Sequence, residues 1–361
     1  MLACVLVPAF AFAQSANTPV RVAIVGLEHG HVAGFLHQFP LQHDAELVAI
    51  VDSDKALTAR YQQQFHLDPK LFYSTLDQAV AATHPQAVLV YTSVGEHRYV
   101  IEQAAQHGLS VMVEKPLTIS LADAIAIRHV AEQHHIQVLV NYETTWYASN
   151  RAVYQEINNG KLGDLRKVVI HDGHEGPKEI GVQPEFLKWL TDPAQNGAGA
   201  LYDFGCYGAD LMTWWMRGET PLSVTAVAQT DKPETYPRVD DDATIILRYP
   251  HAQAVLMPSW NWPFSRKDSE VYGTQGYLIT VGPDKLRARY TGEKQEQEIA
   301  APPLVPPQDT SLHYLAAVLR GELQPKADLT SLDTNIIVMQ ILDAARESAR
   351  TGRTVRLKPL P

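Results

Sequence analysis

Residues 20–31 read VRVAIVGLEHGH, and this stretch decides the fold. Its first six residues are apolar except for Arg21, as in a strand buried on both faces of a parallel sheet. Gly26 follows the strand directly, and a helix-like segment begins a few residues later. A tight turn between such a strand and helix is where a doubly wound α/β domain binds phosphate groups. The stretch therefore predicts a nucleotide-binding domain that begins close to Val20.

Strand-like and helix-like segments continue to alternate after this turn. The apolar runs that we expect to form buried strands are residues 20–25, 47–51, 87–91, 109–113 and 137–140. The segments between them that predict helices are residues 54–65, 75–82, 95–107 and 120–134. Several of these helices open with Asp, Ser or Thr, the usual N-cap residues. Repeated strand–helix units specify a Rossmann-type parallel sheet with helices on both faces. We assign residues 19–141 to this domain.

The pattern changes after residue 142. Strand-like segments now follow one another with few helices between them, at residues 168–171, 222–229, 243–249, 254–259 and 277–281. This succession predicts a mostly antiparallel sheet, and a helix is expected over residues 201–215. A chain of 361 residues also exceeds the ~250–300 residues at which single cores divide. We therefore expect an α/β protein in which residues 142–361 form a second, α+β domain with a large, mostly antiparallel sheet.

Composition narrows the range of partners. The chain has 30 Lys and Arg against 40 Asp and Glu, a formal net charge of -10, and no long basic run. A nucleic-acid partner is therefore not expected, because little positive charge is available to neutralise its phosphates. No run approaches the ~20 apolar residues of a membrane helix, so no membrane association is expected either. With Cys4 and Cys206 as its only cysteines, the chain has no disulfide framework.

The N-terminus resembles an export signal. Residues 2–13 form a short apolar run that ends in Ala11-Phe12-Ala13, the small-x-small pattern of a signal-peptidase site. We predict that residues 1–13 are a signal peptide and that the protein is periplasmic or secreted. No Lys or Arg precedes Arg21, so the positive segment that usually starts a signal peptide is missing. A cytoplasmic enzyme with an apolar N-terminus is therefore the alternative.

The phosphate-binding turn departs from the usual G-x-G-x-x-G pattern. Gly26 supplies the first glycine, but Glu28 and His31 stand where the second and third belong. The turn and the helix N-terminus still offer N–H groups to phosphates, and we place His29, Gly30 and His31 with Gly26 on the cofactor side. The carboxylate of Glu28 would repel a pyrophosphate unless it points away from it.

Asp52 ends the second predicted strand, near the spacing from Gly26 at which an acidic residue binds the ribose 2′-hydroxyl of a dinucleotide. A carboxylate there repels the extra phosphate of NADP, and no Arg follows immediately to offset it. NAD is therefore the expected cofactor, with NADP as the weaker alternative. Asp54 is the better candidate for capping the next helix.

Four ordered motifs carry a resemblance to a known family. They are VEKPL at residues 113–117, YTS at 91–93 with His97, IxxGKLG at 157–163, and GAGALYDFG at 197–205. Together they resemble the Gfo/Idh/MocA oxidoreductases, a family that includes glucose–fructose oxidoreductase and inositol dehydrogenase. The resemblance covers nearly the whole chain after the N-terminal run. It implies a nicotinamide cofactor, a small-molecule carbohydrate or polyol substrate, and a homo-oligomer assembled through the C-terminal sheet.

The resemblance also implies catalytic residues. The family places the Lys of E-K-P at the nicotinamide edge, and an Asp followed four residues later by a His at the substrate. These positions are Lys115, Asp203 and Tyr207 here, so a Tyr replaces the His, as in glucose–fructose oxidoreductase. On the cofactor side, the motifs and the strand ends add Thr92, His97, Glu114 and Asn141.

Oxidation of a carbinol requires a base to accept the hydroxyl proton. Tyr207 can act in this way only if its pKa is lowered from about 10, and a neighbouring Lys115 ammonium is expected to lower it. Lys115 would also stabilise negative charge on the substrate oxygen, with Asp203 orienting the substrate or Lys115. An i, i+4 spacing puts Asp203 and Tyr207 on one face of the predicted helix.

Candidate substrate contacts lie mostly in the second half of the chain. They are Glu143, Trp146, His174 and Trp189, the tryptophans because aromatic faces suit sugar rings. His174 belongs to the segment 171–175, HDGHE, which offers either sugar-hydroxyl contacts or metal ligands. No metal site is expected, because no complete ligand set has a recognisable spacing. Asp240-Asp241-Asp242 is expected to form a solvated turn.

Three functions fit these observations. The first is a nicotinamide-dependent oxidoreductase that exchanges hydride with a hydroxyl of a sugar or polyol. The second is an NAD-dependent glycoside hydrolase that oxidises a sugar transiently, eliminates the aglycone and returns the hydride. The third is a non-catalytic ligand-binding protein on the same fold, since fold alone does not prove turnover.

Overall fold

Strand β1 (Val20–Val25) lies in the middle of a six-stranded sheet in the structure, a computed structural model that describes residues 18–360. The sheet order is β3-β2-β1-β4-β5-β6, and all its pairs are parallel. The other strands are Ala45–Val51 (β2), Phe72–Tyr73 (β3), Ala87–Val90 (β4), Ser110–Glu114 (β5) and Val138–Asn141 (β6). The predicted Rossmann-type sheet is confirmed.

The helices of this domain follow their strands in turn. They are His31–Gln38 (α1), Lys55–Phe65 (α2), Leu76–Thr83 (α3), His97–Gln106 (α4) and Leu121–His134 (α5). As expected, the side chains of Asp54, Thr75 and Ser120 cap the N-termini of α2, α3 and α5.

The second sheet has nine strands within residues 18–360, in the order β14-β13-β12-β11-β7-β10-β9-β8-β15. Its strands are Leu165–Gly173 (β7), Ser223–Gln229 (β8), Asp242–Arg248 (β9), Gln253–Ser259 (β10), Arg266–Gly273 (β11), Gly276–Thr280 (β12), Lys285–Tyr290 (β13), Gln297–Ala300 (β14) and Val355–Arg356 (β15). The β7–β10 pair is parallel and the other pairs are antiparallel, as a mostly antiparallel sheet requires.

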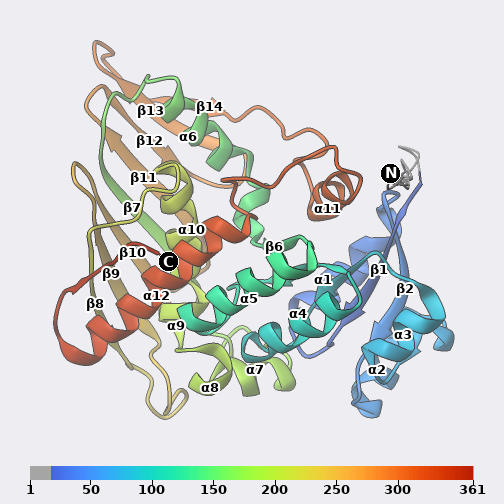
Figure 1. Cartoon of the computed structure of the whole chain (residues 1–361). Coiled ribbons are helices and arrows are strands. Elements are labelled where there is room, and N and C mark those ends of the chain that lie inside the picture. Colours follow the sequence, from blue (N-terminus) through green and yellow to red (C-terminus); the bar gives the residue numbers. More distant parts are fainter. Residues whose placement is uncertain (1–17, 361) are drawn as a thin grey trace, which may run out of the picture.

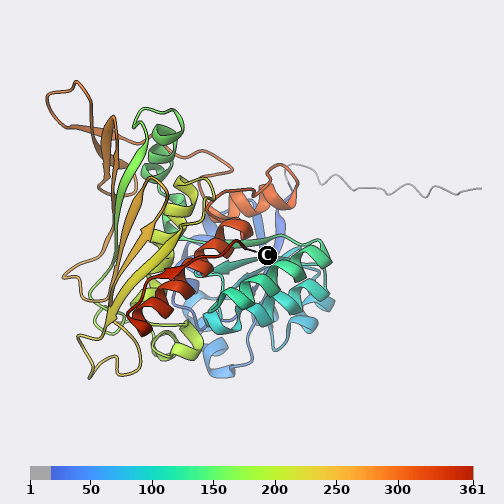
Figure 2. The same cartoon turned by 60° about the vertical axis from the view of Figure 1, so that its left-hand side comes forward.

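Helices cover only one face of this sheet, which Figure 2 shows from the side. They are Ala148–Asn158 (α6), Pro184–Leu190 (α7), Pro193–Asn196 (α8), Ala200–Asp203 (α9), Gly205–Trp215 (α10), Ser311–Leu319 (α11) and Leu332–Thr351 (α12). Helix α12 packs on α10 and β8 and also on α5 of the first domain (Figure 1). Helix α11 adds Leu312 and Leu315 to the same buried cluster as Val22 of β1. The end of the chain therefore holds the two sheets together.

The helix predicted over residues 201–215 forms as two segments, because the chain breaks at Phe204 between α9 and α10. The carbonyl oxygen of Asp203 accepts a hydrogen bond from Lys115 Nζ (3.0 Å). The N–H of Tyr207 donates to Phe204 instead, at 3.2 Å. A side chain from the other domain thus takes the carbonyl that a continuous helix would use.

Two further predictions concern the N-terminal segment and membrane-spanning helices. The predicted signal peptide, residues 1–13, lies outside the described residues. Within residues 18–360, no helix is both long and apolar enough to cross a membrane.

Candidate active site

A buried ion pair joins the end of β5 to the end of α9. Lys115 Nζ lies 2.5 Å from Asp203 Oδ1, and both side chains are almost fully buried. Trp260 Nε1 donates to the other carboxylate oxygen at 2.9 Å. Burial alone would raise the pKa of Asp203, but the Lys115 charge and hydrogen bond outweigh it and lower that pKa below its usual value. Asp203 likewise outweighs burial at Lys115 and raises the pKa of the ammonium. Both groups are therefore charged at neutral pH.

Two ammonium groups lie close to the ring of Tyr207. Lys115 Nζ is 5.1 Å and Lys267 Nζ is 4.9 Å from the centre of its ring. Nevertheless the pKa of Tyr207 is raised, first by burial and then by the charge of Glu143. The expectation that the pKa of Tyr207 is lowered is wrong, because burial has the largest effect on this pKa and raises it. Tyr207 is a protonated phenol at neutral pH, able to donate a hydrogen bond rather than to accept a proton.

His174 borders the same ion pair. Its ring packs edge-on against Phe204, with 4.9 Å between ring centres. Its Nδ1 accepts the N–H of Gly176 at 2.9 Å, so in the neutral ring the proton sits on Nε2. Burial, partly offset by Asp203, lowers the pKa of His174 and favours that neutral form. His174 therefore offers an N–H donor beside Lys115 and Asp203.

The turn after β1 retains donors for a phosphate. Gly26 has φ +85, and a Cβ there would lie 2.6 Å from Thr92 Cγ2, so the position requires glycine. The N–H groups of Glu28 and Gly30 donate to no acceptor within residues 18–360. Two free N–H groups at the start of α1 fit the pyrophosphate of a dinucleotide.

Glu28 turns its carboxylate away from these donors. Oε1 accepts the N–H of Ser93, in the loop after β4, at 2.6 Å. Burial raises the pKa of Glu28 to about 6, although the Ser93 hydrogen bond partly opposes this. The residue that breaks the glycine pattern thus ties the turn to the neighbouring strand.

Asp52 fixes the same turn from the end of β2. Its Oδ2 accepts the N–H of Leu27 at 2.9 Å, and its Oδ1 accepts the N–H of Asp54 at 2.8 Å. Asp54 caps α2 through Ala56 and Leu57, as expected. Each Asp52 oxygen accepts one N–H, which leaves acceptor capacity for a ribose hydroxyl.

A chain of polar side chains runs across the carboxyl ends of β5 and β6. Trp146 Nε1 donates to Asn141 (3.0 Å), Asn141 Nδ2 donates to Glu114 (2.9 Å), and the other Glu114 oxygen lies 2.9 Å from His31 Nδ1. Ligand atoms of His29, His31 and Glu114 lie within 4.8 Å of one another, a grouping that could hold a metal ion and that the sequence did not predict. The neighbouring N–H of His31 donates to His29 Nδ1 at 3.2 Å, so hydrogen bonds within the protein already order the group.

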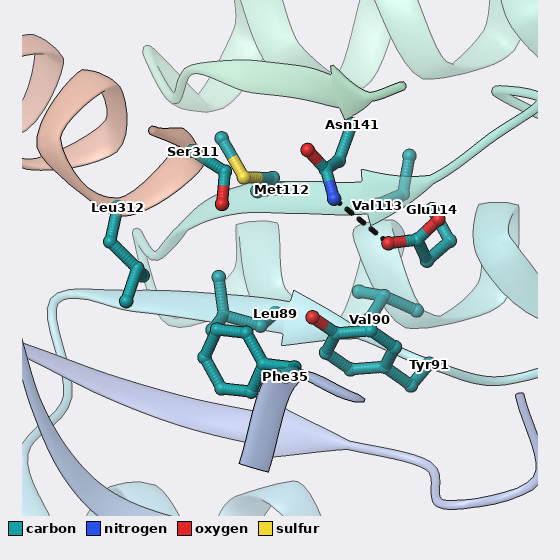
Figure 3. Close-up of a pocket in the computed structure, with 10 residues that line it drawn as sticks. All are labelled: Phe35, Leu89, Val90, Tyr91, Met112, Val113, Glu114, Asn141, Ser311 and Leu312. Atoms are coloured by element: carbon teal, nitrogen blue, oxygen red, sulfur yellow. Dashed lines mark hydrogen bonds between the residues drawn. The ribbon is translucent and has the colours of Figure 1, made fainter. Parts of the chain in front are cut away.

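Figure 3 shows a pocket that Glu114 and Asn141 close at one end. The pocket is small, and Ser311 and Leu312 of α11 line it from the opposite side. The ring of Tyr91 also lines it, 5.6 Å from the ring of Phe35 between ring centres. The polar end of this pocket therefore adjoins the turn that carries His31.

Several predicted residues lie on the cofactor side or in supporting positions. Trp189 and Phe186 pack on His29, and Trp189 Nε1 donates to the carbonyl of Glu28 at 3.3 Å. His97 is buried beneath the E-K-P segment, with Nδ1 3.2 Å from the carbonyl oxygen of Leu117. Within residues 18–360, neither Trp189 nor His97 forms a hydrogen bond or ion pair with the Lys115 or Asp203 side chain.

Glu143 does reach the substrate side. It forms an ion pair with Lys267 and accepts a hydrogen bond from Tyr147 at 2.5 Å. Sequence analysis did not identify Lys267 or Trp260, and it named Asp172 only as part of the segment 171–175. Lys267 lies on an unpredicted strand, and the only available signal for Asp172 was its place in the segment 171–175.

The prediction of a solvated turn at residues 240–242 is wrong. Asp240 accepts the N–H groups of Gly199 and Leu201 at 2.8 and 2.7 Å and so holds the start of α9. Asp241 is fully buried and accepts the N–H groups of Asp231 and Lys232 at 2.8 and 2.7 Å. These carboxylates support the loop that carries Asp203, because α9 ends at that residue.

Comparison with characterised proteins places this geometry in a family. A model of the oxidoreductase family with an NAD-binding Rossmann fold matches residues 20–142, and a model of the GFO/IDH/MocA C-terminal domain matches residues 150–279. D-apiose dehydrogenase of Paraburkholderia graminis is 25% identical over 90% of this chain and 86% of its own length. The NADP(+)-dependent D-xylose 1-dehydrogenase of Haloarcula marismortui is 21% identical over 94% of both chains.

Solved structures share the fold. Aldose-aldose oxidoreductase from Caulobacter crescentus, complexed with glycerol, has a TM-score of 0.80 at 24% identity, covering 94% of this chain and 100% of that chain. An inositol dehydrogenase homologue complexed with NAD+, from Azotobacter vinelandii, has a TM-score of 0.80 at 21% identity, covering 96% and 99%. With both family models matching in order, the chain belongs to the Gfo/Idh/MocA family of oxidoreductases.

Proposed function

We propose that this protein exchanges hydride between a bound nicotinamide dinucleotide and a hydroxyl group of a neutral sugar or polyol. The observation that carries the proposal is the buried Lys115–Asp203 pair with the protonated Tyr207 beside it. A fixed ammonium and a phenol can both stabilise charge on the oxygen of a carbinol that becomes a carbonyl. The names of two relatives, a D-apiose and a D-xylose dehydrogenase, support the substrate class.

The nicotinamide supplies the hydride acceptor when it is bound. The free N–H groups of Glu28 and Gly30 would hold the pyrophosphate, and Asp52 would accept the ribose 2′-hydroxyl. We infer NAD rather than NADP, because a 2′-phosphate would meet the Asp52 carboxylate. Relatives that use either cofactor are known: the D-xylose 1-dehydrogenase is named for NADP(+), and the structure of the inositol dehydrogenase homologue contains NAD+.

The charges around Tyr207 favour a neutral substrate. Lys115 is paired with Asp203, and Lys267 is paired with Glu143. Neither ammonium is left to balance a carboxylate or phosphate on the substrate. In this account Tyr207 donates its O–H to the substrate oxygen, Lys115 stabilises the charge there, and Asp203 holds Lys115 in place.

A kinetic panel tests this proposal. NAD-loaded protein is offered D-apiose, D-xylose, D-glucose and myo-inositol, and the reduced nicotinamide is followed by its absorbance. Aryl glycosides of the same sugars report aglycone release, which would instead identify the NAD-dependent glycoside hydrolase. Lys161→Met, which alters an exposed lysine paired with Glu156, is the control for Lys115→Met. Absence of both reactions in folded, NAD-binding protein would favour the non-catalytic alternative.

Export and self-association are further parts of the proposal. Residues 1–13 would be removed at Ala13, so protein recovered from the periplasm should begin at Gln14. Copies would associate through the uncovered face of the second sheet, where Val227 and Ile246 are 64% and 41% exposed. N-terminal sequencing tests the first idea. Native mass spectrometry of Val227→Lys against the unmodified protein tests the second.

A further inference from the structure

Asp172 is a buried carboxyl group without a partner. It lies near the end of β7, is 3% exposed, and accepts no hydrogen bond from any residue between 18 and 360. By contrast, Asp203 and Asp241 are equally buried but each accepts several hydrogen bonds. An unpaired carboxylate is costly to bury, so a protein that retains one usually keeps it protonated or uses it for proton transfer.

Its cross-strand neighbour connects Asp172 to the active site. Lys267 of β11 lies directly opposite Asp172, so both side chains point to the same face of the sheet. The Lys267 ammonium forms an ion pair with Glu143 rather than with Asp172. It lies 4.9 Å from the centre of the Tyr207 ring. Asp172 and Tyr207 therefore flank one ammonium group, and neither forms a hydrogen bond with it.

A polar cavity adjoins Asp172 on the sheet side. It is narrow, and Asp172, Lys267, Thr144, Asn150 and Leu211 are among its lining residues. The hydroxyl of Thr144 is buried there with no hydrogen-bond partner in the described residues. Asp172 thus lines the same small polar space as Lys267 and Thr144.

The charged groups that face Asp172 from the surrounding elements are Lys267, Asp268, Glu143 and Lys115, and its neutral titratable neighbours are Tyr147 and Cys206. Burial has the largest effect and raises the pKa of Asp172 to about 8. Lys267 and Lys115 lower this pKa in part, whereas Asp268 and Glu143 raise it further. Asp172 is the group of this cluster whose pKa suits proton exchange near neutral pH.

We propose that Asp172 accepts the hydroxyl proton of the substrate during oxidation and returns it during reduction. The inference rests on the proposed function. In oxidation, the carbinol C–H bond breaks and its electron pair leaves as hydride to the oxidised nicotinamide, while the C=O double bond forms. The O–H bond breaks, and the proton forms a new O–H bond with a carboxylate oxygen of Asp172. Tyr207 and Lys115 hold the substrate oxygen throughout.

The pH dependence of kcat/KM tests this role, with the sugar that the unmodified protein oxidises fastest in the panel above. Oxidation by the unmodified protein should speed up as pH rises through about 8, where Asp172 loses its proton. Asp172→Asn should abolish this rise and lower kcat/KM about 100- to 10,000-fold. Lys267→Met removes a charge that lowers the pKa of Asp172, so the midpoint should move to higher pH.

Asp210 offers a matched control. It is a buried carboxyl on α10 with no partner for either oxygen among the described residues. Asp210→Asn should therefore leave the pH profile unchanged. The infrared spectrum gives an independent reading, because a protonated carboxyl has a carbonyl band that a carboxylate lacks. The difference between unmodified protein and Asp172→Asn should contain that band at pH 7 and lose it at pH 9.

Each outcome separates this inference from the proposed function. If sugar is oxidised but Asp172→Asn keeps the rise with pH, the role of Asp172 is wrong and the proposed function stands. A missing infrared difference band at pH 7 would likewise refute a protonated Asp172. If the unmodified protein oxidises no sugar in the panel, the proposed function fails, and the role assigned to Asp172 fails with it.

Discussion

Lys115 Nζ lies 2.5 Å from Asp203 Oδ1 and 3.0 Å from the backbone oxygen of the same residue. One lysine at the end of a Rossmann strand therefore pairs with a carboxylate of the second domain and also interrupts the helix that carries it. Because both side chains are buried, neither can exchange its partner for water. The pair therefore links the two domains and lies at the centre of the proposed active site.

Removing Lys115 should reduce both stability and turnover. Lys115→Met leaves the buried Asp203 carboxylate without a cation, which costs about 3–5 kcal/mol. Denaturant unfolding measures this loss, with Lys161→Met as the exposed control. Adding Asp203→Asn to Lys115→Met should recover part of the stability, since no uncompensated charge remains. Equal unfolding free energies for Lys115→Met and the unmodified protein would show that the pair is not intact in solution.

The same pair predicts how stability depends on pH. The pKa of Asp203 is lowered from 3.8, so its contribution is present above that pH and is lost as pH falls further. The pKa of Lys115 is raised from 10.5, so its contribution is present below that pH and is lost as pH rises beyond it. The stability difference between the unmodified protein and the Lys115→Met, Asp203→Asn double variant, in which neither group of the pair titrates, should therefore hold from about pH 5 to pH 9. A steep change within that range would contradict a charged pair.

Tyr207→Phe keeps the ring beside Lys115 and Lys267 but deletes the hydroxyl. Since the phenol is a hydrogen-bond donor to the substrate oxygen in this account, kcat should fall about 100- to 1,000-fold. NAD binding and the circular dichroism spectrum should not change. Near-normal turnover would remove Tyr207 from the mechanism and leave His174 as the next candidate donor to the substrate oxygen.

Glu28→Gln should strengthen NAD binding in a pH-dependent way. Burial raises the pKa of Glu28 to about 6, so the carboxylate repels a pyrophosphate only above that pH. Glutamine keeps the acceptor for the Ser93 N–H and removes the charge. Affinity should rise about fivefold at pH 8 and change little at pH 5, as calorimetric titration can measure. A weaker complex at pH 8 would mean that the Glu28 carboxylate itself binds the cofactor.

The cofactor preference depends on Asp52. Titration of the apo-protein should give a lower Kd for NAD than for NADP, and Asp52→Ser should narrow the difference. Asp52 also accepts the N–H of Leu27, so Asp52→Ser removes both the charge and a hydrogen bond that holds the turn. Asp52→Asn removes the charge but keeps an acceptor for that N–H, and so separates the two effects. A clear preference for NADP in the unmodified protein would refute the inference.

Local patterns predicted much of the fold. Strand β1 was predicted at its observed bounds, because its continuous apolar run is unambiguous. Strand β11 was missed, because Arg266, Lys267, Asp268 and Glu270 interrupt the apolar alternation. These charged residues are tolerated because the sheet has an uncovered face and because Lys267 faces the polar active site. The broken helix at Phe204 was missed because its cause, Lys115, is distant in sequence.

Some residues of the candidate site could be predicted from local sequence motifs, and others could not. Lys115 and Asp203 belong to short motifs, so they could be identified, and the structure brings them together. The pairing of Asp172 with Lys267 arises only from the register of β7 and β11, which no local pattern reports. The direction of the Glu28 carboxylate likewise depends on Ser93 in another loop. Contacts between distant segments therefore account for most of what sequence reasoning missed.

Hydride transfer to the bound cofactor tests the central claim most directly. The protein, loaded with NAD, is mixed with sugars of the panel that carry deuterium on their carbinol carbons. The released cofactor is then analysed by mass spectrometry. We predict that unmodified protein transfers deuterium to the nicotinamide, and that Lys115→Met transfers far less at equal NAD occupancy. An unlabelled nicotinamide after incubation of folded, NAD-bound protein with every sugar of the panel would contradict the account.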